Sequence, residues 1–230
     1  MSSRDYWERN IKGFSGFYDT GSEETLRGSW LFRAFYRTFL LPVEKAYMRK
    51  RYAMVRSFID SNSEGGTAAD IGCGSGIFSI IMAERQARVY ALDFAKSAVE
   101  LTRENIPANL TERITVDQLD ILNDSIPRVD TAIAIGVLPY VADEATFIDH
   151  IAPNCDRILF NFLDADNLLN RLRKFMVQLD ARGYCYHSKD KIAAQLGHHG
   201  FDIEKEEALA TGWMITARRQ PLKETGLYGK

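Results

Sequence analysis

A turn with a glycine at every second position, set between a strand and a helix, constrains this sequence more than any other feature. Residues 68–76 read Ala-Ala-Asp-Ile-Gly-Cys-Gly-Ser-Gly, and the apolar spacing typical of a helix begins at Ile77. A buried strand that ends in a turn with almost no side chains lets a ligand lie directly against the backbone. The pattern therefore predicts a ligand site at the end of this strand.

From Thr67 onward, strand-like and helical segments alternate along the chain. The predicted strands are 67–71, 88–92, 113–117, 129–135 and 155–162, and the predicted helices are 76–86, 95–105, 143–151 and 165–180. Such alternation favours right-handed crossovers and a parallel sheet with helices on both faces. Two further strands, 201–206 and 211–218, follow a helix capped by Ser188 and form an antiparallel pair. The predicted fold class is α/β: a Rossmann-like seven-stranded sheet of five parallel strands plus a C-terminal antiparallel hairpin.

The chain has 230 residues, which suits one main domain with an appendage. We expect an N-terminal helical cap or lid at 1–62, a ligand-binding domain at 63–220 and a C-terminal tail at 221–230. The boundary near residue 62 follows from the break Ser61-Asn62-Ser63-Glu64-Gly65-Gly66 after a helical pattern.

Charge and cysteine usage exclude several classes of partner. The formal net charge is −2, so nothing global indicates nucleic acid binding. The cysteines, Cys73, Cys155 and Cys185, are too widely spaced for a disulfide framework or a zinc pattern, and no metal constellation is apparent.

The polar N-terminus lacks a signal-peptide core, and no apolar run approaches the length of a membrane span. We therefore expect a cytoplasmic protein.

Several nucleotide-binding folds place a glycine-rich turn after their first strand. A Walker turn needs Lys-Ser/Thr after its last glycine, but Ile77-Phe78 follows here. A dinucleotide fingerprint needs a glycine at position 77, and Gly76 comes one place early. The plainer alternative is that small residues simply let the strand and helix pack closely.

Two acidic residues argue for a ligand, because they follow the next two strands. Asp93 closes the strand 88–92 about 20 residues after the turn, where a carboxylate reaches ribose hydroxyls. Asp120 follows the strand 113–117 and can accept a hydrogen bond from an adenine amine, with Ile121 packed near the ring. An aspartate after a strand is also a common turn former. Together, however, these residues mark the strand ends at which open α/β sheets bind ligands.

The order of these motifs resembles the class I S-adenosylmethionine-dependent methyltransferases over roughly residues 65–218. The motifs are D-I-G-C-G-S-G at 70–76, Y-A-L-D at 90–93, L-D-I at 119–121 and A-I-G-V-L-P-Y at 134–140. The C-terminal half is most similar to the small-molecule O-methyltransferases typified by magnesium-protoporphyrin methyltransferase, through the stretches at 157–162, 184–190 and 200–203.

The resemblance implies roles for particular residues. Asp70, Gly72, Gly74 and Gly76 would form the wall and floor for the methionine part of S-adenosylmethionine. Asp93 would bind the ribose hydroxyls, with Phe94 beside it, and Asp120 and Ile121 would bind the adenine. Gly136 and Val137, with Leu138, would line the passage to the acceptor. Tyr18, in the segment Phe17-Tyr18-Asp19, is the candidate for covering the cofactor and binding its carboxylate.

Methyl transfer from an activated sulfonium needs alignment and a dry pocket, and it needs a base only when the acceptor loses a proton. The candidate bases are Tyr140, His187 and His150. The protoporphyrin enzymes carry a histidine where Tyr140 stands, which argues against the same substrate or the same base. For His187 the plainer alternative is an ordering hydrogen bond at a helix entry, and His150 is expected to pack in the middle of a helix.

The segment from Arg27 to Arg56 holds eight basic residues and one acidic residue, together with many aromatics. It can serve as a lid over an apolar or aromatic acceptor, as a weak contact with acidic lipid headgroups, or as helices packed on the sheet with their basic residues in water.

The function predicted is methyl transfer to a small-molecule acceptor, most simply at oxygen, with S-adenosylhomocysteine as the product. The alternatives are an NAD(P)-dependent oxidoreductase on a similar fold, and a non-catalytic cofactor-binding or partner-binding module. The segment Gly136-Val137-Leu138-Pro139-Tyr140 lacks the Asn/Asp-Pro-Pro-aromatic motif of many amine methylators, which disfavours transfer to nitrogen.

Overall fold

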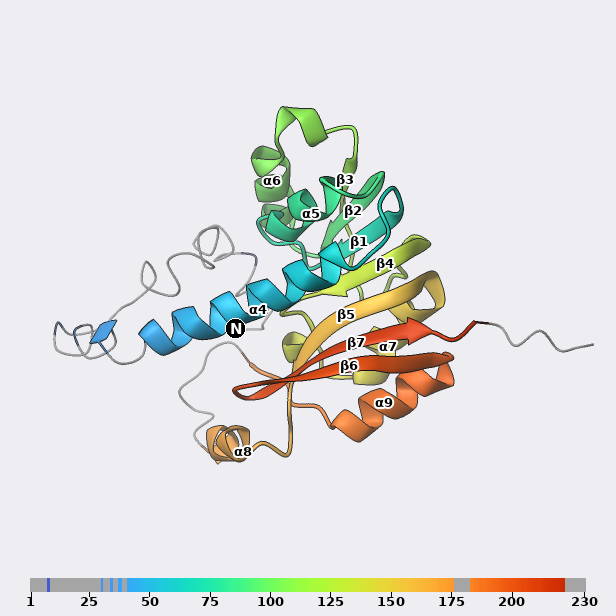
Figure 1. Cartoon of the computed structure of the whole chain (residues 1–230). Coiled ribbons are helices and arrows are strands. Elements are labelled where there is room, and N and C mark those ends of the chain that lie inside the picture. The colour runs from blue at the N-terminus through green and yellow to red at the C-terminus, as the bar shows by residue number, and fades with distance from the viewer. Residues whose placement is uncertain are drawn as a thin grey trace, which may run out of the picture.

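The computed structural model describes residues 41–175 and 183–221, together with Glu8, Trp30, Ala34, Arg37 and Thr38. Seven strands form one sheet in the order β3-β2-β1-β4-β5-β7-β6 (Figure 1). The strands are β1 (Thr67–Ile71), β2 (Arg88–Asp93), β3 (Ile114–Gln118), β4 (Val129–Ala134), β5 (Cys155–Leu163), β6 (Phe201–Leu209) and β7 (Gly212–Arg219). β1 to β5 pair in parallel, and β7 is antiparallel to both β5 and β6. The predicted fold class is confirmed.

Helices cover both faces of the sheet. They are α4 (Leu41–Asp60), α5 (Ile77–Ala83), α6 (Lys96–Asn105), α7 (Glu144–Ile151), α8 (Leu168–Phe175) and α9 (Lys189–His198), with short 3-10 helices η4 (Ala108–Leu110), η5 (Leu138–Tyr140) and η6 (Ala152–Asn154). One apolar cluster joins α4, α5 and α6 to one face, and a second joins α7 and α9 to the other. A parallel sheet needs both covers because its strands are buried on both faces.

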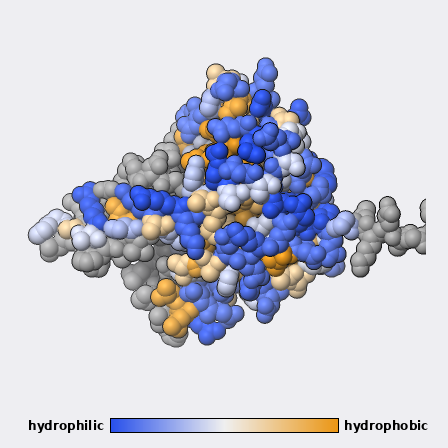
Figure 2. Space-filling model, in the orientation of Figure 1, coloured by the Kyte–Doolittle hydropathy of each residue, from blue (hydrophilic) through white to orange (hydrophobic). Residues whose placement is uncertain are grey.

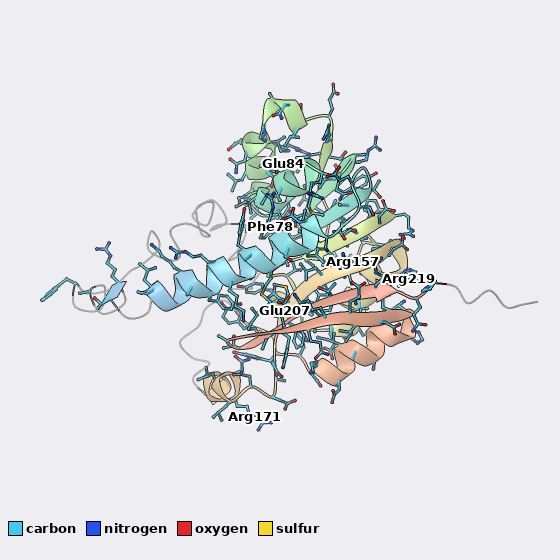
Figure 3. All side chains as sticks on the ribbon, in the orientation of Figure 1. Phe78, Glu84, Arg157, Arg171, Glu207 and Arg219 are labelled. Carbon is cyan, nitrogen blue, oxygen red and sulfur yellow. The ribbon has the colours of Figure 1, made fainter. Side chains whose placement is uncertain are left out.

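The N-terminal cap was predicted over residues 1–62, and most of residues 1–40 lie outside the described residues. Helix α4 is the part of this segment that the structure describes. It begins at Leu41 with Pro42 in its first turn, where proline is tolerated because the N–H it lacks has no helical partner there. Its C-terminal half carries Val55 and Phe58 into the core. Arg157 of β5, labelled in Figure 3, places its guanidinium 4.7 Å from the centre of the Phe58 ring. Figure 1 shows the first half of α4 extending beyond the sheet.

The C-terminal hairpin is longer than predicted. β6 runs to Leu209 and the turn is at residues 210–211, whereas the sequence analysis ended this strand at 206. β6 is an edge strand, so charged side chains such as Glu204 face water and mask the alternation that would reveal a strand. Glu204 also forms ion pairs with Arg157 and Arg218, which tie the edge to β5 and β7.

The described helices include none that is both long and apolar enough to cross a bilayer. Figure 2 shows an apolar area at α8, where Leu168 and Leu169 are 71% and 54% exposed. Most of the remaining surface in this view is hydrophilic.

Candidate functional site

The predicted glycine turn lies at the point where the order of the sheet reverses. The chain runs outward from β1 to β2 and β3, and then returns to β4 on the other side of β1. Gly72, Gly74 and Gly76 have φ angles of +71°, +58° and +80°, a region that glycine adopts without the penalty other residues incur. A Cβ added to Gly72 would stand 2.4 Å from Cγ2 of Val137. The turns after β1 and β4 therefore touch at the carboxyl ends of the strands, where such sheets bind ligands.

Helix α6 holds the glycine turn from the side. Thr102 donates from Oγ1 to the carbonyl of Gly74 at 3.1 Å, and the side-chain amide of Asn105 donates to the carbonyl of Ser75 at 3.0 Å. A Cβ on Gly76 would lie 2.8 Å from the Thr102 methyl group, so this glycine also allows the close approach of α6. The sequence analysis missed both anchoring residues.

Two buried carboxylates flank the turn. Asp70, at 2% exposure, accepts a 2.6 Å hydrogen bond from the hydroxyl of Ser79 on α5. Asp93, at 7% exposure, accepts hydrogen bonds from the backbone amides of Gly74 at 3.0 Å and Ala95 at 2.9 Å. The structure therefore brings Asp93 and the glycine turn together, as the sequence predicted.

Burial dominates the electrostatics of these two carboxylates. Loss of hydration raises the pKa of Asp70 to about 6 despite the Ser79 hydrogen bond, and the charge of Asp93 acts in the same direction. Loss of hydration likewise raises the pKa of Asp93 to about 6, against the lowering effect of the Ala95 and Gly74 amides. Within 41–175 and 183–221, no ion pair joins either carboxylate to a lysine, arginine or histidine. A buried carboxylate without a cationic partner is typical of a site that binds a ligand.

The turn after β3 provides two hydrogen bonds to the carboxylate of Asp120. Its carboxylate accepts from the amide of Leu122 at 3.2 Å and from the side-chain amide of Asn123 at 2.6 Å. Ile121 is buried in the core, and its carbonyl lies 2.6 Å from Nδ1 of His150 on α7. These contacts match the turn-forming alternative for Asp120 and the packing role for His150, and the adenine contact stays a prediction.

Phe94 belongs to the loop between β2 and α6. Its backbone carbonyl accepts a 2.8 Å hydrogen bond from the side-chain amide of Gln118, the last residue of β3. This bond links the loop after Asp93 to the end of β3. Phe94 follows Asp93 directly in the chain, next to the carboxylate that the sequence assigned to the ribose.

The turn after β4 is held by a buried asparagine that the sequence analysis missed. Gly136 has a φ of +81°, and its amide donates to Oδ1 of Asn161 on β5 at 2.7 Å. Asn161 is 2% exposed. Its signal in the sequence is a polar residue inside the apolar run Leu159-Phe160-Asn161-Phe162 of a central strand.

The other two candidate bases, Tyr140 and His187, differ in their surroundings. Tyr140 ends η5, and its ring centre lies 5.4 Å from that of Tyr184. His187 is 2% exposed, with Nδ1 3.0 Å from a carboxylate oxygen of Glu144 and Nε2 3.0 Å from the carbonyl of Leu138. Protein groups occupy both ring nitrogens, so neither is left to take a proton from an acceptor. The geometry favours the ordering role that was the alternative for His187.

Tyr18 lies outside the described residues. In the described part of the chain, no group of three or more His, Cys, Asp or Glu side chains is arranged to hold an ion.

The fold is shared with methyltransferases of known structure. A family model described as a methyltransferase domain matches residues 69–156, which span the glycine turn, Asp93, Asp120 and the turn after β4. The predicted methyltransferase domain is therefore confirmed over these residues.

Individual relatives and solved structures are also named as methyltransferases. Magnesium protoporphyrin IX methyltransferase from Synechocystis PCC 6803, solved with bound SAH, superposes with a TM-score of 0.69 at 23% identity, covering 94% of this chain and 98% of that one. The ribosomal protein L11 methyltransferase of Alkaliphilus metalliredigens is 37% identical over 154 residues, which are 66% of this chain and 42% of that protein. The magnesium-protoporphyrin O-methyltransferase of Rhodobacter capsulatus is 23% identical over 107 residues, or 46% of this chain and 44% of that one. The chain thus spans less than half the length of these curated relatives.

Proposed function

We propose that this protein is an S-adenosylmethionine-dependent methyltransferase that acts on an oxygen of a small-molecule acceptor. The observation that carries the proposal is the pair of buried carboxylates, Asp70 and Asp93, on either side of the glycine turn with no cation paired to them in the described chain. A ligand with hydroxyl donors and positive charge satisfies both.

The residues present fit this cofactor. Each carboxylate oxygen of Asp93 accepts one backbone hydrogen bond and has lone-pair capacity for another, as two adjacent ribose hydroxyls require. The three left-handed glycines expose backbone where side chains would otherwise stand. Relatives of the same fold are solved with SAH and SAM bound.

S-adenosylmethionine, when bound, supplies a methyl group on a positively charged sulfonium that is already activated for displacement. The protein's contribution is alignment and exclusion of water. Asp70 and Asp93 orient the cofactor, and the turn at Gly136 and Val137 forms the boundary toward the acceptor. Tyr140 is the candidate to contact the acceptor, and Tyr18 remains the candidate to cover the cofactor.

A small acceptor is supported by the structure named for a porphyrin methyltransferase, which superposes over 94% of this chain. In sequence, the relative named for ribosomal protein L11 aligns with 66% of this chain and the magnesium-protoporphyrin relative with 46%, so a protein acceptor belongs in the test. Transfer to oxygen is favoured by the sequence Gly136-Val137-Leu138-Pro139-Tyr140 at the acceptor boundary. An apolar or aromatic acceptor fits the tyrosine pair Tyr140 and Tyr184.

Calorimetric titration tests the cofactor. We expect S-adenosylhomocysteine and S-adenosylmethionine to bind, and Asp93→Ala to weaken binding by roughly ten- to hundredfold, the value of hydrogen bonds to a charged group. Asp117→Ala is the matched control, because Asp117 is an exposed residue of the neighbouring strand β3. Binding of NADH in place of both ligands would instead support the oxidoreductase.

Transfer of a labelled methyl group tests the acceptor class. The panel comprises phenols, carboxylic acids, amines and purified ribosomal protein L11. Methylation of phenols or carboxylic acids supports the proposal, and methylation of the amines or L11 alone contradicts it. Tight cofactor binding with no transfer to any member would favour the non-catalytic module.

A further inference from the structure

A buried histidine ties together the elements that form the acceptor side of the site. The backbone of His187 bridges the end of β5, because its amide donates to the Leu163 carbonyl at 2.9 Å and its carbonyl accepts from the Ala165 amide at 2.9 Å. Its ring reaches two other elements, Glu144 in the first turn of α7 and Leu138 in η5. The residue is 2% exposed, so water does not substitute for these contacts.

The chemistry of the two ring contacts determines the charge on the ring. Burial of the Glu144 carboxyl acts to raise its pKa, but hydrogen bonds from its own backbone amide and from the His187 ring, with the nearby charge of Lys191, hold that pKa below its ordinary value. Glu144 is therefore an ionised acceptor. The carbonyl of Leu138 is also only an acceptor. A ring that satisfies two acceptors must carry a proton on both nitrogens.

Among the described residues, Glu144 is the charged side chain that contacts this ring. Glu144 of α7 lies 3.0 Å away, and Lys191 of α9 lies 3.9 Å from the other oxygen of the same carboxylate. Asp164, the bridge partner of His187, directs one carboxylate oxygen to the Trp213 indole N–H and the other to the Asp166 amide.

The same segment holds the turn that carries Tyr140. The amide of Cys185 donates to the Pro139 carbonyl at 2.7 Å, next to the bond between the His187 ring and Leu138. Tyr184, one residue earlier, packs on Tyr140. The consecutive carbonyls of Leu138 and Pro139 thus accept hydrogen bonds from residues 187 and 185. The position of Tyr140 depends on these two hydrogen bonds.

We propose that His187 is a positioning residue: as an imidazolium paired with Glu144, it holds η5 and Tyr140 in place beside the cofactor site. The proposal rests on the proposed function of that site. It assigns the charged His187 ring to holding η5 in place, and not to catalysis as a base. The group nearest the acceptor is then Tyr140, and His187 acts through it.

Nitrogen NMR of the histidine rings tests the charge directly. At pH 7 we expect both nitrogens of His187 to be protonated in the wild-type protein, and the ring to become neutral in Glu144→Gln. A neutral His187 ring in the wild-type protein would overturn the proposal.

Amide hydrogen exchange tests the positioning. We expect His187→Gln to speed the exchange of the Cys185 and Val141 amides about tenfold, the loss expected for a charge-assisted hydrogen bond. His199→Gln is the matched control: the His199 ring pairs with Asp149 at 2.6 Å and so links the end of α9 to α7, but it makes no contact with η5. Equal effects of the two substitutions would overturn the proposal, and Glu144→Gln supplies the same readout if His187→Gln does not fold.

Calorimetry with S-adenosylhomocysteine separates the two proposals. We expect its affinity to stay within about twofold in His187→Gln, as for a site without a shared contact. A large loss of affinity in this variant would contradict a role confined to η5. If wild-type protein binds no S-adenosylhomocysteine, the proposed function fails, whereas the NMR and exchange results still decide the role of His187.

Discussion

Substituting Gly72 with alanine tests whether the contact between the turns after β1 and β4 sets the shape of the site. At φ = +71°, an alanine incurs about 1–2 kcal/mol for its left-handed backbone. Its Cβ would also stand 2.4 Å from Cγ2 of Val137, and overpacking of this kind costs about 1–3 kcal/mol. We therefore expect Gly72→Ala to lower the free energy of unfolding by about 2–5 kcal/mol.

A second glycine separates the two contributions. Gly200 has nearly the same φ, +73°, but a Cβ there would meet nothing within 4 Å. Gly200→Ala should therefore show the backbone cost alone, about 1–2 kcal/mol. Urea unfolding of the two variants, monitored by circular dichroism, measures the difference between them.

The substitution Val137→Ala completes a double-mutant cycle. It removes Cγ2 and leaves the Val137 Cβ at 3.8 Å from the new methyl, an ordinary contact. In the Val137→Ala background, Gly72→Ala should then cost no more than Gly200→Ala. Equal costs for the two glycine variants in the wild-type background would refute the argument, as would a cycle with no coupling between positions 72 and 137.

Three further predictions concern the residues around the turns. Asp70 has a pKa of about 6 in the folded protein against an ordinary 3.8, so the folded protein loses stability as the pH rises between these values. The stability of Asp70→Asn relative to wild type should therefore increase from about pH 4 to 6 and stay constant above pH 6. Urea titrations that show the same difference at every pH would contradict this. Thr102→Val loses the hydrogen bond to Gly74, so calorimetry should show severalfold weaker S-adenosylhomocysteine binding at a stability cost of about 1 kcal/mol, and unchanged affinity would count against this anchor. Asn161→Ala leaves the Gly136 amide without its acceptor and should lower the free energy of unfolding in urea by about 1–3 kcal/mol. A variant as stable as the wild-type protein would disprove this prediction.

The sequence predicts the central strands well and the edge strand poorly, for a physical reason. The first strand was predicted at 67–71, which are its bounds in the structure, because a strand covered on both faces is apolar throughout and ends at a glycine. β6 has one neighbour and a solvated edge, so Glu206 and Glu207 fit the strand as well as they fit a loop. Local composition therefore cannot distinguish the end of an edge strand from the start of a loop.

The same limit applies to the site. Asp70 and Asp93 were predictable because the strand ends and the glycine spacing define their place along the chain. Thr102 and Asn161 act across 28 and 25 residues of sequence, and only the folded sheet and helices bring them to Gly74 and Gly136. His187 was named as a candidate base because a histidine beside a pocket suggests one, and the sequence does not show that both ring nitrogens have partners.

The place of β7 between β5 and β6 has a consequence for synthesis on the ribosome. β5 and β6 are both complete before β7 emerges, so β5 has only β4 beside it and β6 has no neighbour until residues 212–219 leave the exit tunnel. During that interval the backbone of β5 from Arg157 to Leu163 is an open edge able to pair with another nascent chain. Of the seven described strands, the last to be translated is thus the one that joins β5 to β6, and a chain that stalls before it would be a substrate for chaperones.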